Sequence, residues 1–200
     1  GVHDWRGLSA KSGKHPETRV DNYAEWARRG GWSSSSGRGW ANLSNAPFRM
    51  YKRYTHEGGV ATPLIVHWPA GVKAKGALRH APSHLIDIAP TCLAAAGLEG
   101  KGMEGQSLLP VFAKDQKQAR TLFWEHEGNR AVRKGDYKLV AMHNTPWELY
   151  DMNKDRSELK DLASSMPKKT AELRSAWEAW AKRVGAKPWD EVNVKKKKKK

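Results

Sequence analysis

Residues 49–59, Arg-Met-Tyr-Lys-Arg-Tyr-Thr-His-Glu-Gly-Gly, run straight into residues 60–69, Val-Ala-Thr-Pro-Leu-Ile-Val-His-Trp-Pro. The first part is cationic and aromatic, and two glycines join it to an apolar run. Glycine tolerates unusual backbone angles and close backbone approach, so the junction suits a turn at the mouth of a site. Composition alone favours a plain surface loop before a core strand. The continuous apolar run 63–68 predicts a strand buried on both faces, as in an α/β sheet.

A helix is predicted over residues 83–97, because apolar residues recur there with helical spacing. They share one face: Leu85, Ile88, Cys92, Leu93 and Ala96. Asp87 is the expected N-cap and Gly97 the expected stop. Cys92, the one cysteine of the chain, is expected to be a buried structural thiol, and no intrachain disulfide is possible.

The second half of the chain predicts a small α+β unit. Four short runs separated by turn residues read as an antiparallel meander, at residues 121–126, 129–133, 137–142 and 147–150. A helix is predicted over 168–184, with Ser165 as N-cap and Gly185 as stop.

Changes in composition along the chain predict its division into domains. We expect one region over residues 1–113, which opens with a long polar loop at 1–39. A small α+β subdomain over 114–187 and a basic tail over 188–200 follow it.

The composition describes a basic chain with enough apolar residues to fold. Lys and Arg number 36 against 21 Asp and Glu, a net charge of +15, and six of the lysines form the run Lys195–Lys200. Such an excess favours anionic partners, whether nucleic acid, acidic lipid or sulfated and phosphorylated substrates. With 38% apolar residues and ten Trp a core can be buried. No apolar run reaches the roughly 18 residues that a membrane span needs.

The start of the chain and its histidines bear on two questions: whether the chain carries a localisation signal and whether it holds a metal site. Gly1 starts a stretch without Met and without signal-peptide character, so we expect localisation signals and essential residues upstream of it. His80 and His84 have i, i+4 spacing but no acidic partner or third ligand. They are expected to be a surface or core pair, and no metal site is expected in this chain.

Several short motifs carry further information through their order. They are residues 45–52 (Asn-Ala-Pro-Phe-Arg-Met-Tyr-Lys), 55–66, 83–91 (Ser-His-Leu-Ile-Asp-Ile-Ala-Pro-Thr), 105–109, 131–139, and 147–152 with Glu158 and 161–163. Together, across about residues 38–185, they resemble the C-terminal part of a sulfatase of the arylsulfatase type, within the alkaline-phosphatase-like superfamily. Arg156 stands where the family usually has proline.

The resemblance implies a fold, a reaction and a substrate class. The fold is α/β: the C-terminal part of an alkaline-phosphatase-like sulfatase domain, followed by the small α+β subdomain with its four-stranded antiparallel sheet and C-terminal helix. Such enzymes convert a Cys or Ser to formylglycine, whose hydrate attacks the sulfur of a sulfate ester while Ca²⁺ holds the sulfate oxygens. The substrate is a small-molecule or carbohydrate sulfate ester rather than nucleic acid. The location is periplasmic or extracellular.

The resemblance also assigns residues on the cationic segment. The lysine five residues before Glu-Gly-Gly belongs to the sulfate pocket in this family, and here it is Lys52, the expected catalytic and substrate-binding residue. Its compact ammonium suits an oxyanion whose charge grows as the S–O bond breaks. His56, on the same loop, is a second candidate for substrate binding. Arg53 and Arg49 are further cations that would admit an anion, and Arg49 fits equally well as a structural anchor.

Other elements of the family pattern are absent from the chain. The nucleophile motif Cys/Ser-x-Pro-x-Arg is matched in spacing by residues 45–49, but Asn45 cannot yield formylglycine. Cys92 lacks the motif altogether, and Asp21-Asn22 is not followed by the glycine of the metal motif. The nucleophile and the calcium ligands are therefore expected upstream, and the chain alone is expected to be inactive.

Two other functions remain open from the sequence. A phosphoester or phosphonate hydrolase shares the superfamily, although no phosphatase-type metal-histidine pattern is present. A basic polyanion-binding module without chemistry would show binding that weakens steeply with salt and depends on Lys195–Lys200.

Overall fold

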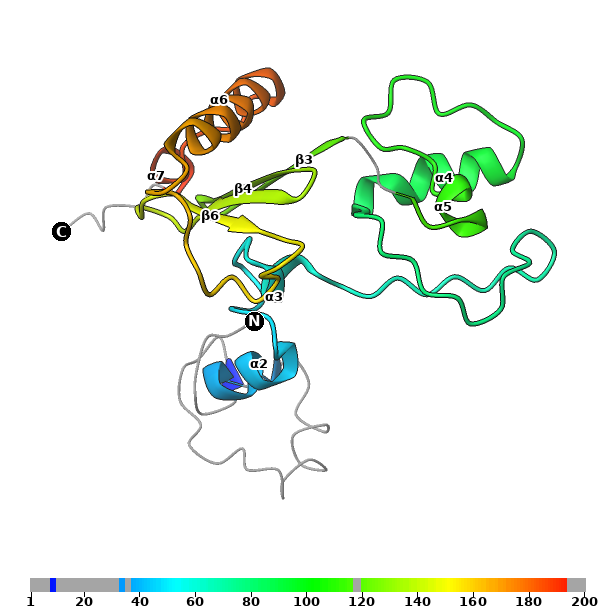
Figure 1. Ribbon diagram of the computed structural model, residues 1–200, viewed down its shortest axis with the longest axis horizontal. Coiled ribbons are helices and arrows are strands. Elements are labelled where there is room, and N and C mark those ends of the chain that lie inside the picture. The colour runs from blue at the N-terminus through cyan, green and yellow to red at the C-terminus, as the bar shows by residue number, and fades with distance from the viewer. Residues whose placement is uncertain (1–7, 10–32, 35–36, 117–119, 194–200) are drawn as a thin grey trace. The chain divides into compact units, whose positions relative to one another are not determined.

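The computed structural model describes residues 8–9, 33–34, 37–116 and 120–193 (Figure 1). They fall into two compact units, one from residues 1–61 and 123–200 and the other from 62–122. Most of the predicted loop 1–39 lies outside the described residues, as do Asp21-Asn22 and Lys195–Lys200. The predicted domain boundaries after residues 113 and 187 stay a prediction.

The first unit is built on a four-stranded sheet in the order β3-β4-β5-β6. The strands are β3 Thr121–His126, β4 Asn129–Lys134, β5 Tyr137–Ala141 and β6 Glu148–Asp151. β5 lies antiparallel to both β4 and β6. The four predicted strands and their meander are confirmed.

Successive side chains of each strand point to opposite faces of the sheet, and both faces contain buried residues. One face packs against helix α6, Pro167–Val184, through residues of β4, β5, β6 and the helix: Val132, Leu139, Leu149 and Leu173. The other face buries Ala131, Val140, Tyr150 and Met152. Because Lys138 and Glu148 share the parity of Val140 and Tyr150 along their strands, these charged residues also belong to the second face. Figure 1 shows α6 and the segment around α3 on opposite sides of the sheet.

Helix α6 begins and ends for different reasons. Pro167 occupies its first turn, where a missing N–H costs little. The predicted cap Ser165 is wrong: its hydroxyl donates to the Leu162 carbonyl, and Met166 is the N-cap without a side-chain bond. Gly185, in the left-handed conformation at φ 70°, ends the helix as predicted.

Short elements complete the first unit. β1 Leu8–Ser9 pairs with β2 Ser33–Ser34. Helix α2 spans Gly37–Asn45, the single turn α3 spans Glu57–Val60, and α7 spans Trp189–Val192.

The second unit contains the 3₁₀ turn η2 Leu85–Asp87, α4 Ile88–Ala95 and α5 Leu109–Ala113. The predicted helix over 83–97 is thus confirmed in its centre, and Gly97 at φ 75° follows its end. No helix among the described residues is long and apolar enough to cross a membrane.

Asp87 organises this unit, but not as the predicted side-chain cap of α4. Its fully buried carboxylate accepts backbone N–H bonds from His84 (2.7 Å) and Gln106 (3.0 Å), and both its oxygens bind the Arg120 guanidinium. Burial opposes the charged form, yet the bonds from Arg120 and the two amides keep the pKa of Asp87 below its ordinary value.

The predicted burial of the apolar face of α4 is wrong. Leu85 is 84% exposed, Ile88 is 37% exposed and Cys92 is exposed. The helix is apolar around most of its circumference, and the described residues pack against the side that carries Asp87 and Thr91 instead.

The predicted strand over residues 63–68 is also wrong. The segment forms no strand in the structure, and Leu64, Ile65 and Val66 are exposed. A strand exists only when neighbouring strands accept and donate its backbone hydrogen bonds, and no described strand lies beside this segment.

Candidate functional site

The cationic segment, residues 49–59, is called the lysine loop below, and its two glycines are required by close packing. A Cβ at Gly58 would overlap the carbonyl oxygen of Met50, and one at Gly59 would overlap that of Tyr54. Both glycines lie in the single turn α3, so they let the loop fold back against its own backbone. The predicted turn at this junction is therefore a closed helical turn.

The backbone on both sides of Lys52 is strained. Met50 has φ 66° and Arg53 has φ 94°, a region that residues with a side chain rarely adopt. Such conformations cost about 1–3 kcal/mol each and persist only where the surroundings hold them. Contacts of the loop with the sheet and its turns supply this restraint.

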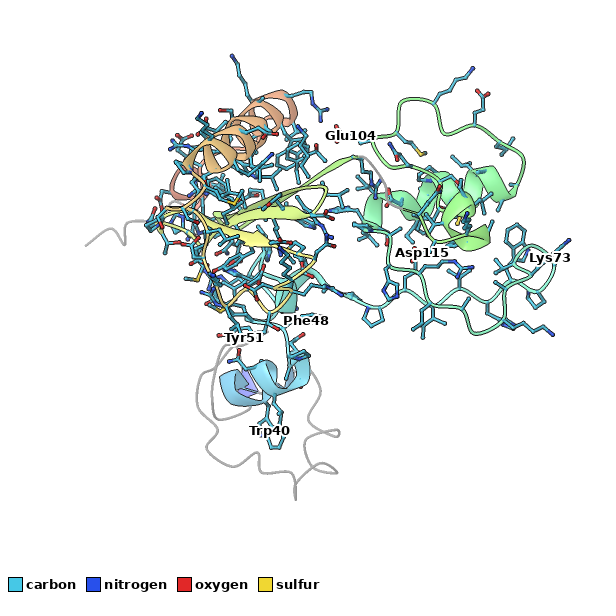
Figure 2. All side chains as sticks on the ribbon, in the orientation of Figure 1. Trp40, Phe48, Tyr51, Lys73, Glu104 and Asp115 are labelled. Atoms are coloured by element: carbon cyan, nitrogen blue, oxygen red, sulfur yellow. The ribbon has the colours of Figure 1, made fainter. Side chains whose placement is uncertain are left out.

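Arg49 holds the first end of the loop. Its Nη1 donates to Glu148 Oε2 (3.0 Å), the Tyr150 hydroxyl (2.8 Å) and the Glu158 carbonyl (3.1 Å). Arg49 is therefore the structural anchor that the sequence left as one of two options. Figure 2 labels Phe48 and Tyr51, which lie on either side of Arg49 in the chain, between helix α2 and the sheet.

One carboxylate oxygen of Glu148, Oε2, accepts hydrogen bonds from three side chains. His56 Nε2 lies 3.3 Å away, the Tyr150 hydroxyl 2.6 Å and Arg49 Nη1 3.0 Å. The hydrogen bond from His56 is the largest influence, and together these groups outweigh burial and lower the pKa of Glu148 to about 2. Burial and the same carboxylate raise the pKa of Tyr150.

The depressed pKa of Glu148 predicts acid sensitivity. A carboxylate with a lowered folded-state pKa adds stability above its unfolded pKa, and this contribution is lost as pH falls towards about 2. We expect Glu148→Gln to lower the free energy of unfolding by about 1–2 kcal/mol at pH 7, since the group is partly exposed.

Urea unfolding of both proteins between pH 2 and pH 7 checks this expectation. The difference between wild type and Glu148→Gln should shrink as pH falls below about 4.5, while Glu178→Gln on exposed α6 should show little difference at any pH. A constant difference down to pH 2 would contradict the assignment.

The middle of the loop is held by the turn between β3 and β4. Arg53 Nε lies 2.6 Å from Glu127 Oε2, and the Asn129 side-chain amide donates to the Arg53 carbonyl (3.2 Å). Lys52 therefore lies in the chain between two anchored arginines, Arg49 and Arg53.

An ionic cluster of buried Glu57, Lys138 and Glu158, with the half-exposed Arg156 at its edge, holds the far end of the loop. Lys138, which has no exposed surface, places its Nζ 3.0 Å from Glu57 Oε1 and 2.9 Å from Glu158 Oε1. Glu158 also accepts the backbone N–H of Glu57 (2.9 Å), and Arg156 donates to the second Glu57 oxygen (2.9 Å). Burial opposes the charged form of Glu57, but Lys138 and Arg156 keep its pKa below the ordinary value.

The structure places the two predicted site residues differently. Lys52 is exposed, and its ammonium pairs with no acidic group of the described residues. His56 has no exposed surface and faces Glu148, while its Nδ1 has no hydrogen-bond partner among the described residues. The roles of Lys52 in catalysis and of His56 in substrate binding stay predictions.

Sequence reasoning missed the ionic cluster. A signal was present in β5, because a strand that places Lys138 on the same face as Val140 has to bury a lysine. A buried lysine needs carboxylate partners. Only the fold shows that these partners are Glu158 and Glu57, the latter 81 residues away from Lys138 in the chain.

The described residues contain no group of three or more His, Cys, Asp and Glu that could hold a metal ion. His80 and His84 do not form such a group. What these residues offer an anion is thus an exposed ammonium on a loop whose backbone is restrained.

Known proteins match the chain over this same region. The family described as N-sulphoglucosamine sulphohydrolase, C-terminal, matches residues 48–180. An uncharacterised sulfatase of Schizosaccharomyces pombe is 30% identical over 163 residues, covering 73% of this chain and 29% of that protein. The N-acetylgalactosamine-6-sulfatase of Mus musculus is 34% identical over 118 residues, covering 56% and 22%.

A solved structure is also similar. The crystal structure of Ps i-CgsB superposes with a TM-score of 0.62 at 27% identity, covering 70% of this chain and 34% of that one. The same protein is known in complex with k-i-k-neocarrahexaose. The matches confirm the predicted resemblance and fold class, and the chain spans 22% to 29% of the two curated relatives.

Proposed function

Because the chain belongs to the family of the N-sulphoglucosamine sulphohydrolase C-terminal domain, we propose that the protein that carries it is a sulfatase hydrolysing sulfate esters. One observation carries the proposal: Lys52 presents an exposed ammonium on a strained loop held by Arg49, Arg53 and Glu57. Because the loop backbone is held in place, the ammonium is confined to one region, which limits the rearrangement needed when charge develops on the ester oxygen.

The neighbouring cations have other tasks. Arg49 is engaged with Glu148 and Tyr150, and Arg53 with Glu127. Their charges are thus largely compensated, which leaves Lys52 as the group of the loop available to an anion. In the proposed mechanism Lys52 binds the sulfate group and stabilises the leaving oxygen as the S–O bond breaks.

The nucleophile and the metal are proposed to come from elsewhere in the sulfatase. When present, formylglycine supplies the attacking oxygen and Ca²⁺ neutralises the sulfate oxygens. No group of the described residues is suited to hold that ion, and the contribution proposed for the described residues is binding and charge stabilisation.

We propose a carbohydrate sulfate ester as substrate and a periplasmic or extracellular location. Support for the substrate comes from the relatives, which include an N-acetylgalactosamine-6-sulfatase and a protein crystallised with a neocarrahexaose. The name of the first relative places a sulfate on a sugar ring, where an exposed ammonium has access to it.

The test is an assay of the complete protein with paired esters. We expect sulfate release from 4-methylumbelliferyl sulfate or a sulfated oligosaccharide, and much slower release of phosphate from 4-methylumbelliferyl phosphate. Equal or faster phosphate release would favour the phosphoesterase alternative. Absence of both activities, with glycan binding that disappears when Lys195–Lys200 are removed, would favour the polyanion-binding module.

A further inference from the structure

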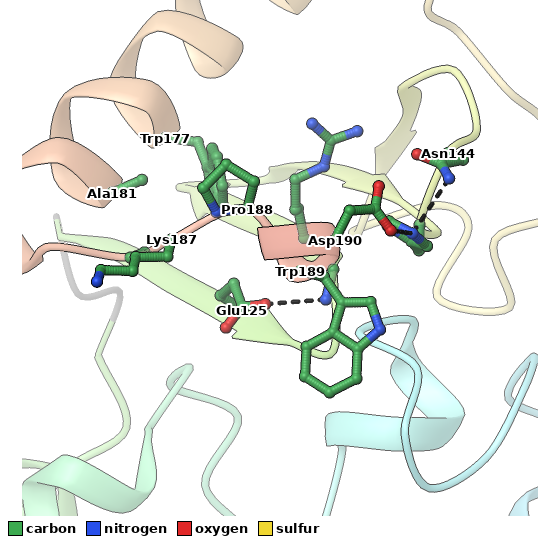
Figure 3. Close-up of a pocket in the computed structure, with 12 residues that line it drawn as sticks. Glu125, Asn144, Trp177, Ala181, Lys187, Pro188, Trp189 and Asp190 are labelled. Atoms are coloured by element: carbon green, nitrogen blue, oxygen red, sulfur yellow. Dashed lines mark hydrogen bonds and ion pairs between the residues drawn. The ribbon is translucent and has the colours of Figure 1, made fainter. Parts of the chain in front are cut away.

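A pocket of about 270 Å³ lies at one end of the sheet in the first unit. Figure 3 shows it between the end of α6, the start of α7 and the loops that join the strands. The residues that line it include two cations, two carboxylates and two tryptophans: Arg130, Lys187, Glu125, Asp190, Trp177 and Trp189. None of these residues belongs to the lysine loop.

Two tryptophans give the pocket apolar surfaces in fixed positions. The Trp177 indole N–H donates to the Trp124 carbonyl (3.1 Å), which locks its ring against the sheet. Trp189 begins α7, and its Cβ packs against the backbone of Gly128 in the β3–β4 turn. The Trp177 ring, which is held in this way, offers a flat face to a ligand at little entropic cost, and Trp189 adds a second aromatic surface to the lining.

Arg130 brings a cation with unused donors. Its guanidinium lies 4.5 Å from the centre of the Trp147 ring and 5.7 Å from that of Trp177. It has no carboxylate partner among the described residues, where its Nε is also buried without a hydrogen bond. Burial is the largest influence that lowers the pKa of Arg130. Arg130 as a whole is only partly buried and lines the pocket, so an acidic group of a ligand can reach its guanidinium.

The rim adds polar groups that hydrogen bonds hold in place. Asp190 Oδ1 lies 3.1 Å from His143 Nε2, which is also 3.1 Å from the Asn144 side-chain amide. Glu125 accepts the backbone N–H of Gly128 (2.9 Å). The pocket thus offers oriented donors and acceptors beside aromatic rings, a combination that suits a polyhydroxylated ring with an acidic substituent.

We propose that this pocket binds one acidic saccharide unit, with the sugar ring on the tryptophan surface and its sulfate or carboxylate at Arg130. The class of ligand rests on the proposed function. Its place fits an extended glycan: Gly128 lines the pocket, and the adjoining Glu127 is ion-paired with Arg53 of the lysine loop. A glycan with one sulfate at Lys52 would reach the pocket across the β3–β4 turn.

The test measures binding of two probes, the hexasaccharides of κ-carrageenan and of chondroitin 6-sulfate, to the intact chain. Lys195–Lys200 are replaced by serine in every variant, which removes non-specific attraction by the tail. We expect Arg130→Gln and Trp189→Ala each to weaken binding of at least one probe about tenfold. Lys160→Gln is the matched control, because this lysine is exposed and does not line the pocket; it should change binding less than about twofold.

Three outcomes would overturn the proposal: no binding of either probe, equal weakening by Arg130→Gln and Lys160→Gln, or unchanged binding in Trp189→Ala. Circular dichroism verifies that each variant is folded. If Arg130→Gln does not fold, two other measurements test the proposal. Trp189→Ala should weaken binding of the probes, and desulfated probes should bind the parent chain more weakly than the sulfated ones. The readout is binding, so failure of the proposed function appears separately, as absence of sulfate release by the complete protein.

Discussion

Replacing Lys52 by alanine in the complete sulfatase is expected to lower kcat by about 10²–10³-fold, the usual cost of removing one preorganised group that stabilises transition-state charge. The side chain is exposed and pairs with no acidic group of the described residues. Its removal should therefore leave the melting temperature unchanged. The comparison is sulfate release together with thermal unfolding, measured on the same preparations.

Lys160→Ala is the matched control, because this lysine is also exposed but lies outside the lysine loop. It should leave kcat unchanged. Near-normal turnover of Lys52→Ala would remove Lys52 from the sulfate pocket while leaving the family assignment intact. A loss that affects KM alone would instead mean that Lys52 binds substrate and transition state equally.

Replacing Lys138 by methionine is expected to lower the free energy of unfolding by about 3–5 kcal/mol, because two buried carboxylates then lose their shared cation. Glu57 and Glu158 lie 3.0 and 2.9 Å from Lys138 Nζ, and both are buried. Arg156 compensates only Glu57, and it is half exposed. Urea unfolding followed by near-ultraviolet circular dichroism measures the change.

Two further variants show whether charge is the cause. Adding Glu57→Gln and Glu158→Gln to Lys138→Met should recover part of the loss, since no buried charge then stays unpaired. Lys134→Met, at the exposed end of β4, should cost no more than about 1 kcal/mol although it breaks the ion pair with Glu172. A Lys138→Met chain as stable as wild type would refute the cluster.

The same substitution connects stability with the proposed activity. If the cluster acts through the position of Lys52, Lys138→Met should reduce turnover in the wild type. It should add little in a Lys52→Ala background, because the two residues then act as one unit. Full additivity of the two losses would mean that the cluster stabilises the fold without positioning Lys52.

Local patterns predicted much of the first unit. The strands from residue 121 onwards and helix α6 carry their own signals in alternation, helical spacing and turn glycines, such as Gly128 and Gly185. These elements pack against each other within one unit, so local preference and tertiary packing agree. The apolar run 63–68 and the face of α4 around Cys92 were predicted as core from equally clear patterns. They are exposed because burial requires a partner, and the described residues provide none.

By itself the sequence determined that residues 49–59 form a cationic segment ending in two glycines and that a small antiparallel sheet with a helix follows, while the resemblance to sulfatases singled out Lys52 as the candidate sulfate-binding residue. These properties depend on residues close together in the chain. The tertiary structure alone decided that His56 is buried against Glu148, that Arg49 is an anchor, and that Lys138 neutralises Glu57 and Glu158. The reason is physical: the pairing of a buried charge depends on which distant residues the fold brings within about 3 Å, and a local pattern carries no record of that.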